Sequence, residues 1–131
     1  MHMEANVARQ NEQWIEFENC VINTKDVNFI SSCNFAYSSG VINIKFTNCT
    51  INKSGTNTFM YDYSLTHTGN IVFDNCKLNI ENECELFTSL YNTTTRGYKN
   101  LRFTFINTEF PLNFKTTNID KTNGEIKVEI Y

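Results

Sequence analysis

The sequence predicts an all-β solenoid of about four to five stacked coils, because one short phrase recurs along most of the chain. Each copy contains a central Phe, an Asn two residues later, and a Cys or Thr that is followed two positions on by an apolar residue. The copies centre on Phe17, Phe46, Phe73 and Phe105, so they lie 29, 27 and 32 residues apart. A repeat of this length, built on strand-like alternation, is typical of a solenoid.

Composition and charge agree with a strand-rich domain. The 131 residues include one Pro and many Asn, Thr, Ile and Phe, and the last three favour strands whereas Asn favours turns. The net charge is −3, so we expect no basic face for nucleic acid. No apolar run approaches the roughly 20 residues of a membrane span, and no membrane partner is expected.

The chain divides into an N-terminal segment and one repeat domain. Residues 1–13 precede the first phrase and are expected to form a tail or a capping helix, and residues 14–131 to form the solenoid. A short helix over residues 4–13 would cover the open edge of the first coil. A frayed tail is the alternative, and both remain open.

Each coil is expected to contain three strands. In the first strand Ile15 and Phe17 alternate with Glu16 and Glu18, which gives an apolar and a charged side. Asn19 follows as a sharp bend, because Asn tolerates a left-handed backbone. Stacking would place a column of Phe rings and a ladder of amides inside the solenoid. The amides are those of Asn19, Asn48, Asn75 and Asn107.

A second short strand follows the Asn bend, and a third begins 12 or 13 residues after the central Phe, at Phe29, Phe59 and Leu86. Before each next coil comes a glycine, which predicts a positive φ or a close approach of two backbones. These glycines are Gly40, Gly69, Gly97 and Gly124.

The five cysteines indicate reduced thiols. Cys20, Cys49 and Cys76 occupy one slot of the repeat, so stacked coils would hold their β-carbons roughly 4.7–4.9 Å apart. A disulfide prefers β-carbons about 3.8 Å apart, and an odd number of cysteines leaves one unpaired. Reduced thiols that fill space as small apolar groups favour a cytoplasmic protein.

The four Phe-x-Asn units, with the Cys or Thr and the apolar residue that follow them, resemble the right-handed parallel β-helix of the pectate-lyase-like superfamily. The resemblance covers about residues 14–131. It implies the fold and no single activity, because that superfamily includes lyases, hydrolases, phage tail spikes, adhesins and non-catalytic proteins. A β-sandwich is the main competing fold, but it does not explain why one phrase recurs in one register.

The sequence indicates a poor active site. Enzymes that resemble this fold gather acids, Arg or Lys, or calcium on an outer sheet, and glycosidases need two carboxylates about 5–9.5 Å apart. The third-strand slot offers a single carboxylate between hydroxyls, in Ser32, Asp62 and Ser89. The slot after the central Phe offers two acids that are two coils apart, in Glu18, Thr47, Asp74 and Thr104. We therefore expect no catalysis, no cofactor and no metal site.

The leading hypothesis is a non-catalytic protein that binds a protein partner through a rigid β-helix face. A phage-type inhibitor of a host nucleic-acid-handling or defence enzyme, acting in the host cytoplasm, would fit the small size and acidic balance. Glu81, Glu83 and Glu85 alternate along one face if that segment is extended, and Arg96 and Tyr98 suit an interface anchor. The simpler interpretation of the glutamates is a solvated face that discourages edge pairing. Coil edges would also permit a homo-oligomer.

The alternative is a glycan-binding or glycan-cleaving fragment of a phage tail spike or adhesin. It would use Tyr61, Asp62, Tyr63 and His67, since Tyr combines a flat apolar face with a hydroxyl. The structural interpretation is that one or both tyrosines continue the strand alternation with a buried side. His67 has no second His or Cys at metal-ligand spacing.

Overall fold

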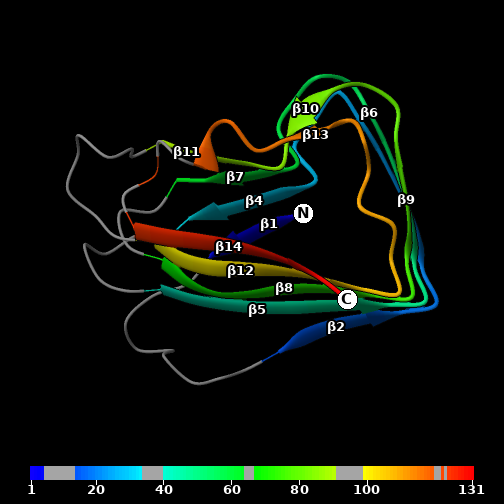
Figure 1. The fold of residues 1–131 in the computed structure, drawn as a ribbon, viewed down its shortest axis with the longest axis horizontal. Helices are drawn as coiled ribbons and strands as arrows, with labels where there is room; N and C mark the ends of the chain where they lie inside the picture. The colour runs from blue at the N-terminus through cyan, green and yellow to red at the C-terminus, as the bar shows by residue number, and fades with distance from the viewer. Residues whose placement is uncertain (5–13, 34–39, 64–66, 91–98, 120–121, 123) are drawn as a thin grey trace.

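The computed structural model describes residues 1–4, 14–33, 40–63, 67–90, 99–119, 122 and 124–131. Over these residues the protein is an all-β parallel solenoid of about three turns (Figure 1). Every pairing between its strands is parallel. The predicted fold class is confirmed. The predicted four to five coils exceed the roughly three turns that the structure has.

Sheet B has five strands in the order β14-β12-β8-β5-β2 and forms the lower layer in Figure 1. Its strands are β2 (Ile15–Glu18), β5 (Gly40–Thr47), β8 (His67–Asp74), β12 (Lys99–Ile106) and β14 (Gly124–Ile130). The central Phe residues of the four copies lie in register across β2, β5, β8 and β12. The predicted alignment of the four central Phe residues is therefore confirmed.

Sheet A has the order β1-β4-β7-β11. It consists of β1 (His2–Glu4), β4 (Ile30–Cys33), β7 (Met60–Asp62) and β11 (Phe87–Ser89). β1 pairs with β4, and the N-terminal amine donates to the carbonyl oxygen of Phe29 at 3.0 Å. Residues 2–4 thus form an added strand, so the expected helix does not begin at Glu4. The rest of that expected helix, residues 5–13, lies outside the described residues.

Sheet C is smaller and has the order β3-β6-β9. Its strands are β3 (Val21–Lys25), β6 (Thr50–Ser54) and β9 (Lys77–Ile80). Two further short strands, β10 (Cys84–Glu85) and β13 (Phe114–Lys115), pair with each other at the turn from sheet C to sheet A. Among the described strands none pairs with the outer edge of β9.

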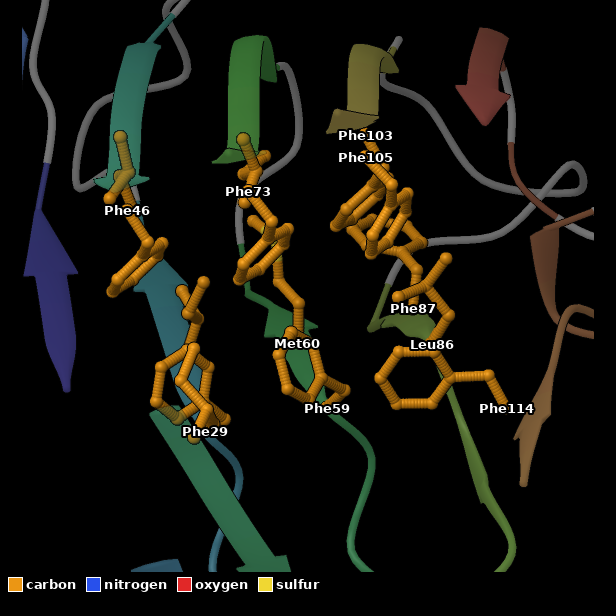
Figure 2. Close-up of a cluster of buried hydrophobic side chains, with 14 of the residues drawn as sticks. Phe29, Phe46, Phe59, Met60, Phe73, Leu86, Phe87, Phe103, Phe105 and Phe114 are labelled. Atoms are coloured by element: carbon orange, nitrogen blue, oxygen red, sulfur yellow. The ribbon is translucent and has the colours of Figure 1, made fainter. Parts of the chain in front are cut away.

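The core contains the predicted column of Phe rings. Phe17, Phe46, Phe73 and Phe105 stack with centroids 5.1, 5.1 and 5.2 Å apart, and the rings are within 13° of parallel. A second stack starts at Phe29, whose ring lies 4.8 Å from that of Phe59. Figure 2 shows these side chains in two facing rows between sheets B and A. The column predicted from the repeat is confirmed.

The corner asparagines adopt the predicted backbone but lie elsewhere than expected. Asn19, Asn48, Asn75 and Asn107 have φ values of 55°, 54°, 52° and 46°. Asn75 Nδ2 donates to Asn48 Oδ1 at 2.7 Å. All four side chains are exposed, so the amide column lies on the outer corner and the prediction that it runs inside is wrong. An outer corner lets the unused amide groups bond to water, which avoids a desolvation cost.

The four cysteines whose side chains are described are free thiols, as predicted, and three of them occupy the cysteine slot: Cys20, Cys49 and Cys76, with Cys84 in β10. Cys49 and Cys76 lie just inside the corner, and their thiols contact the carbonyl oxygens of Thr47 and Asp74 at 3.3 and 3.4 Å. Thr108 takes this slot in the fourth copy.

Two of the predicted glycines sit where backbones approach closely. Gly69 has φ 149° and Gly124 has φ 122°, and an added Cβ would lie 1.6 Å from the oxygen of Ile42 and 2.0 Å from that of Lys99. Gly40 does not occupy the same repeat position as Gly69, because in the strand register it pairs with His67. Gly97 lies outside the described residues.

Candidate functional site

The predicted row Ser32, Asp62 and Ser89 exists, since these residues are paired across β4, β7 and β11. Its orientation is the opposite of that expected. Ser32 and Asp62 are 0% exposed, so the carboxylate points into the solenoid. Asp62 therefore cannot belong to an outer glycan-binding platform, and that part of the prediction is wrong.

The Asp62 carboxylate has its partners inside. Ser32 Oγ donates to Asp62 Oδ1 at 3.1 Å, and Lys99 Nζ lies 3.1 Å from Asp62 Oδ2. Burial lowers the pKa of Lys99, and the neighbouring Asp62 charge opposes that shift. The pair joins sheet A to sheet B across the core. It is a structural element, because a partner cannot reach it from outside.

Tyr61 and Tyr63 lie on the outer side of sheet A, with ring centroids 4.4 Å apart. Tyr63 is 44% exposed, and partial burial raises the pKa of Tyr61. The interpretation that the tyrosines continue the strand alternation agrees with the structure, and the fully buried side of the strand belongs to Met60 and Asp62. His67 begins β8, and its side chain lies outside the described residues.

The three glutamates do not form one extended strip. β9 ends at Ile80 and β10 begins at Cys84, so a bend separates Glu81 from Glu85. Glu83 pairs with Lys115 at 3.0 Å, and Glu85 Oε2 accepts from the amide of Asn118 at 3.2 Å. The two remaining residues of the predicted protein-binding set, Arg96 and Tyr98, lie outside the described residues.

The predicted row of residues after the central Phe is only partly in register in the structure. Glu18, Thr47 and Asp74 are in register, but the fourth member is Ile106, and Thr104 pairs with Val72. Asp74 forms an ion pair with Lys45 at 3.4 Å. Two carboxylates at catalytic spacing are therefore absent from this row.

Neither a thiol nucleophile nor a metal centre emerges from the described residues. Burial raises the pKa of both Cys76 and Cys84, which disfavours the reactive thiolate. Within the described ranges, no three His, Cys, Asp or Glu side chains are grouped so that they could hold a metal ion.

The described surface contains a groove of about 1120 Å³ that sequence reasoning missed. One side consists of the strands of sheet C, and the other is the segment 109–113 of the fourth repeat copy. In Figure 1 the chain between β12 and β13 follows a path that departs from that of β9. We call it the sheet C groove.

Pro111 explains why the groove exists. In the third coil the Lys77 amide donates to the Cys49 carbonyl oxygen, one residue before β6, and the Glu81 amide donates to the Lys53 carbonyl oxygen within β6, each at 2.9 Å. Alternation assigns the Asn79 amide to the same edge. Pro111 stands at the position of Asn79, four residues after the corner Asn, and has no N–H to donate. The Asn113 side chain bonds to the Ile80 carbonyl oxygen instead, at 2.6 Å. The fourth copy therefore cannot extend sheet C.

Packing holds the diverging segment in place. The Phe110 ring turns toward the core and lies 5.1 Å from the ring of Phe105 and 5.6 Å from that of Phe114. Leu112 is left 97% exposed at the rim of the groove.

The groove also carries exposed charges of both signs. They are the side chains of Lys25, Lys77, Glu81 and Glu109. None of the four forms an ion pair with a described residue. In contrast, the sheet B charges Lys45, Arg102 and Lys127 each have an acidic partner within 3.4 Å. The groove thus presents four exposed charges that no described residue neutralises.

Along the floor runs a second amide ladder that the sequence analysis did not identify. Asn79 Nδ2 donates to Asn52 Oδ1 at 2.6 Å, and Asn52 Nδ2 donates to Asn23 Oδ1 at 2.8 Å. A signal for it was present, because each Asn lies four residues after a corner Asn. Pro111 breaks that series, and this break is the signal that could have predicted the groove.

Comparisons with protein families, curated proteins and solved structures return no match to the chain. Over the described residues, the structure contains no helix long and apolar enough to cross a membrane.

Proposed function

We propose that the protein is a non-catalytic binding protein that engages a protein partner through the sheet C groove. The observation that carries the proposal is the interruption of sheet C by Pro111, which leaves a hollow of about 1120 Å³ beside an open strand edge. The floor is rigid, since three parallel strands and a ladder of amides form it. A preformed surface binds with a smaller ordering cost than a flexible one.

The charges of the groove favour a protein over other macromolecules. A nucleic acid would require a predominantly basic surface, and the groove exposes Glu81 and Glu109 beside Lys25 and Lys77. A neutral glycan would leave all four charges without a partner. A polypeptide can supply both an acid and a base, so it satisfies this lining best.

Site-directed photo-crosslinking in the producing cells tests the proposal. A benzophenone amino acid replaces Lys25 in the groove or, as the matched control, the exposed Asn100 on sheet B. We expect one discrete protein adduct from position 25 and none from position 100. Adducts from position 100 alone, or the same diffuse adducts from both, would contradict the proposal.

A glycan-binding function is the second candidate, and one observation favours it. Tyr61 and Tyr63, whose rings contact each other at an interplanar angle of 38°, form a partly exposed aromatic surface on sheet A. A glycan array that gives a signal with the wild type and loses it in Tyr63→Ala would support this function. Asp62→Ala would not test glycan binding, because Asp62 is a buried structural residue.

The narrower hypothesis of a phage-type inhibitor that acts in the host cytoplasm stays a prediction. The identity of a crosslinked partner tests it directly. A host nucleic-acid-handling or defence enzyme in the adduct would support it, and a partner of another class would contradict it.

A further inference from the structure

The outer edge of β9 offers backbone groups that no described strand uses. The Lys77 and Glu81 amides donate to the Cys49 and Lys53 carbonyl oxygens of the preceding coil. The alternating residues Leu78 and Ile80 therefore direct their N–H and C=O groups to the opposite side. That side faces the sheet C groove. In sheet B the corresponding edge of β8 is fully paired with β12.

The two ends of this edge are capped by side chains, but its middle is open. Thr108 Oγ1 accepts from the Cys76 amide at 2.9 Å, and Asn113 Nδ2 donates to the Ile80 carbonyl oxygen at 2.6 Å. Between these caps, Leu78 forms no hydrogen bond on the groove side with any described residue. An open edge between defined ends is a template for one short strand.

We propose that an extended peptide segment of the partner adds to β9 as the next strand of sheet C. The inference rests on the proposed function and specifies its binding mode. Strand addition supplies affinity through main-chain hydrogen bonds and specificity through alternating side chains. The β9 segment Lys77–Ile80 is about 13 Å long at 3.3 Å per residue, which matches a peptide of four or five residues.

The neighbouring side chains define the chemistry of this peptide. An apolar residue of the added strand would cover the half-buried Leu78 and contact Leu112. On the outward side, an acidic residue would pair with Lys77 and a basic one with Glu81. The peptide therefore alternates apolar with charged residues and carries both signs of charge.

Amide hydrogen exchange measured by NMR tests the open edge. In the free protein we expect the Leu78 amide to exchange much faster than that of Ile51, which faces β9 within the sheet. Equal protection of the two amides in the free protein would overturn the inference, because the edge would then be occupied already.

A displayed library of random seven-residue peptides serves as the probe for the occupant. We expect the selected peptides to slow hydrogen exchange of the Leu78 amide. N-methylation of every second peptide residue should weaken binding at least about tenfold, and N-methylation of the residues between them should have little effect. An absence of selected peptides, or binding without this period of two, overturns strand addition. The crosslinking at position 25 decides the proposed function separately.

Leu112→Asp provides the matched variant, with Leu90→Asp as its control, since Leu112 is 97% and Leu90 51% exposed. We expect about a tenfold loss of peptide affinity in the first and no change in the second, with similar thermal stability in both. Dimerisation that Leu112→Asp abolishes would assign the edge to a second copy of the chain and overturn the inference. Displacement of the peptide by a glycan, with protection of the same Leu78 amide, would also overturn the inference.

Discussion

Sheets B and C receive strands from the same repeated phrase, yet sheet B has five strands and sheet C has three. In sheet B the inward slots of the fourth copy hold Leu101, Phe103, Phe105 and the ion-paired Lys99, and every amide can donate, so β12 pairs along its whole length with β8. In sheet C the fourth copy has Pro111 where an amide donor is needed. One missing N–H therefore separates a sheet that the fourth copy extends from a sheet that ends at β9 beside a groove.

The largest effect should come from the core behind sheet B. Phe73→Ala removes a fully buried ring that stacks on both sides, and we expect a loss of about 3–5 kcal/mol in the free energy of unfolding. Leu78→Ala removes a half-buried side chain beside the groove and should cost less, about 1–2 kcal/mol. Urea denaturation of both variants measures the difference. Equal losses would mean that sheet C is as tightly packed as sheet B.

The buried pair that joins sheet A to sheet B gives the next effect. Asp62→Asn should cost about 3 kcal/mol at pH 7, because it leaves the Lys99 ammonium in the core without its counter-charge.

The pH dependence of this variant follows from the lowered pKa of Lys99. The folded state binds fewer protons than the unfolded state between the lowered pKa and the ordinary value of 10.5, so stability rises with pH in this window. Loss of Asp62 removes the opposing charge, lowers the pKa further and widens the window. Urea denaturation from pH 7 to 10 should show a steeper rise in Asp62→Asn than in wild type, and none in Lys99→Met.

The corner that feeds both sheets should show a smaller effect. Asn75 has φ 52°, a conformation that costs most L-residues roughly 1–2 kcal/mol, and it donates to Asn48. We expect Asn75→Ala to lose about that amount and Asn75→Gly to lose less, because Gly adopts this φ freely. If thermal denaturation finds Gly no better than Ala, the backbone conformation is not the reason for Asn at this corner.

Pro111→Thr should change stability least and the groove most. A restored N–H can add about 0.5–1.5 kcal/mol through one hydrogen bond, and removal of Pro loses about 0.4–1 kcal/mol through the unfolded chain. These two contributions to stability nearly cancel. The measurement is therefore hydrogen exchange of the Leu78 amide, which should slow as the fourth copy pairs with β9. Unchanged exchange would show that the packing of Phe110, and not the missing N–H, holds the groove open.

Much of the fold was readable from local pattern. Phe17, Phe46 and Phe73 were aligned correctly because the interval between copies and the strand alternation both specify their register. The left-handed backbone of the corner Asn residues followed from residue type alone. The groove was not predicted, although Pro111 was visible, because the path after a broken ladder depends on where Phe110 can pack.

By itself, the sequence determined the parallel coils, the Phe column and the bends, since each depends on a local preference repeated at a regular interval. Only the tertiary structure decided which side of Tyr61-Asp62-Tyr63 faces the core. The carboxylate is stable inside because Lys99, 37 residues further on, supplies its counter-charge, and Ser32 of the preceding coil supplies a hydrogen bond. A local pattern contains no information about such distant partners, so the burial of Asp62 and the open edge of β9 emerged only when the coils were stacked.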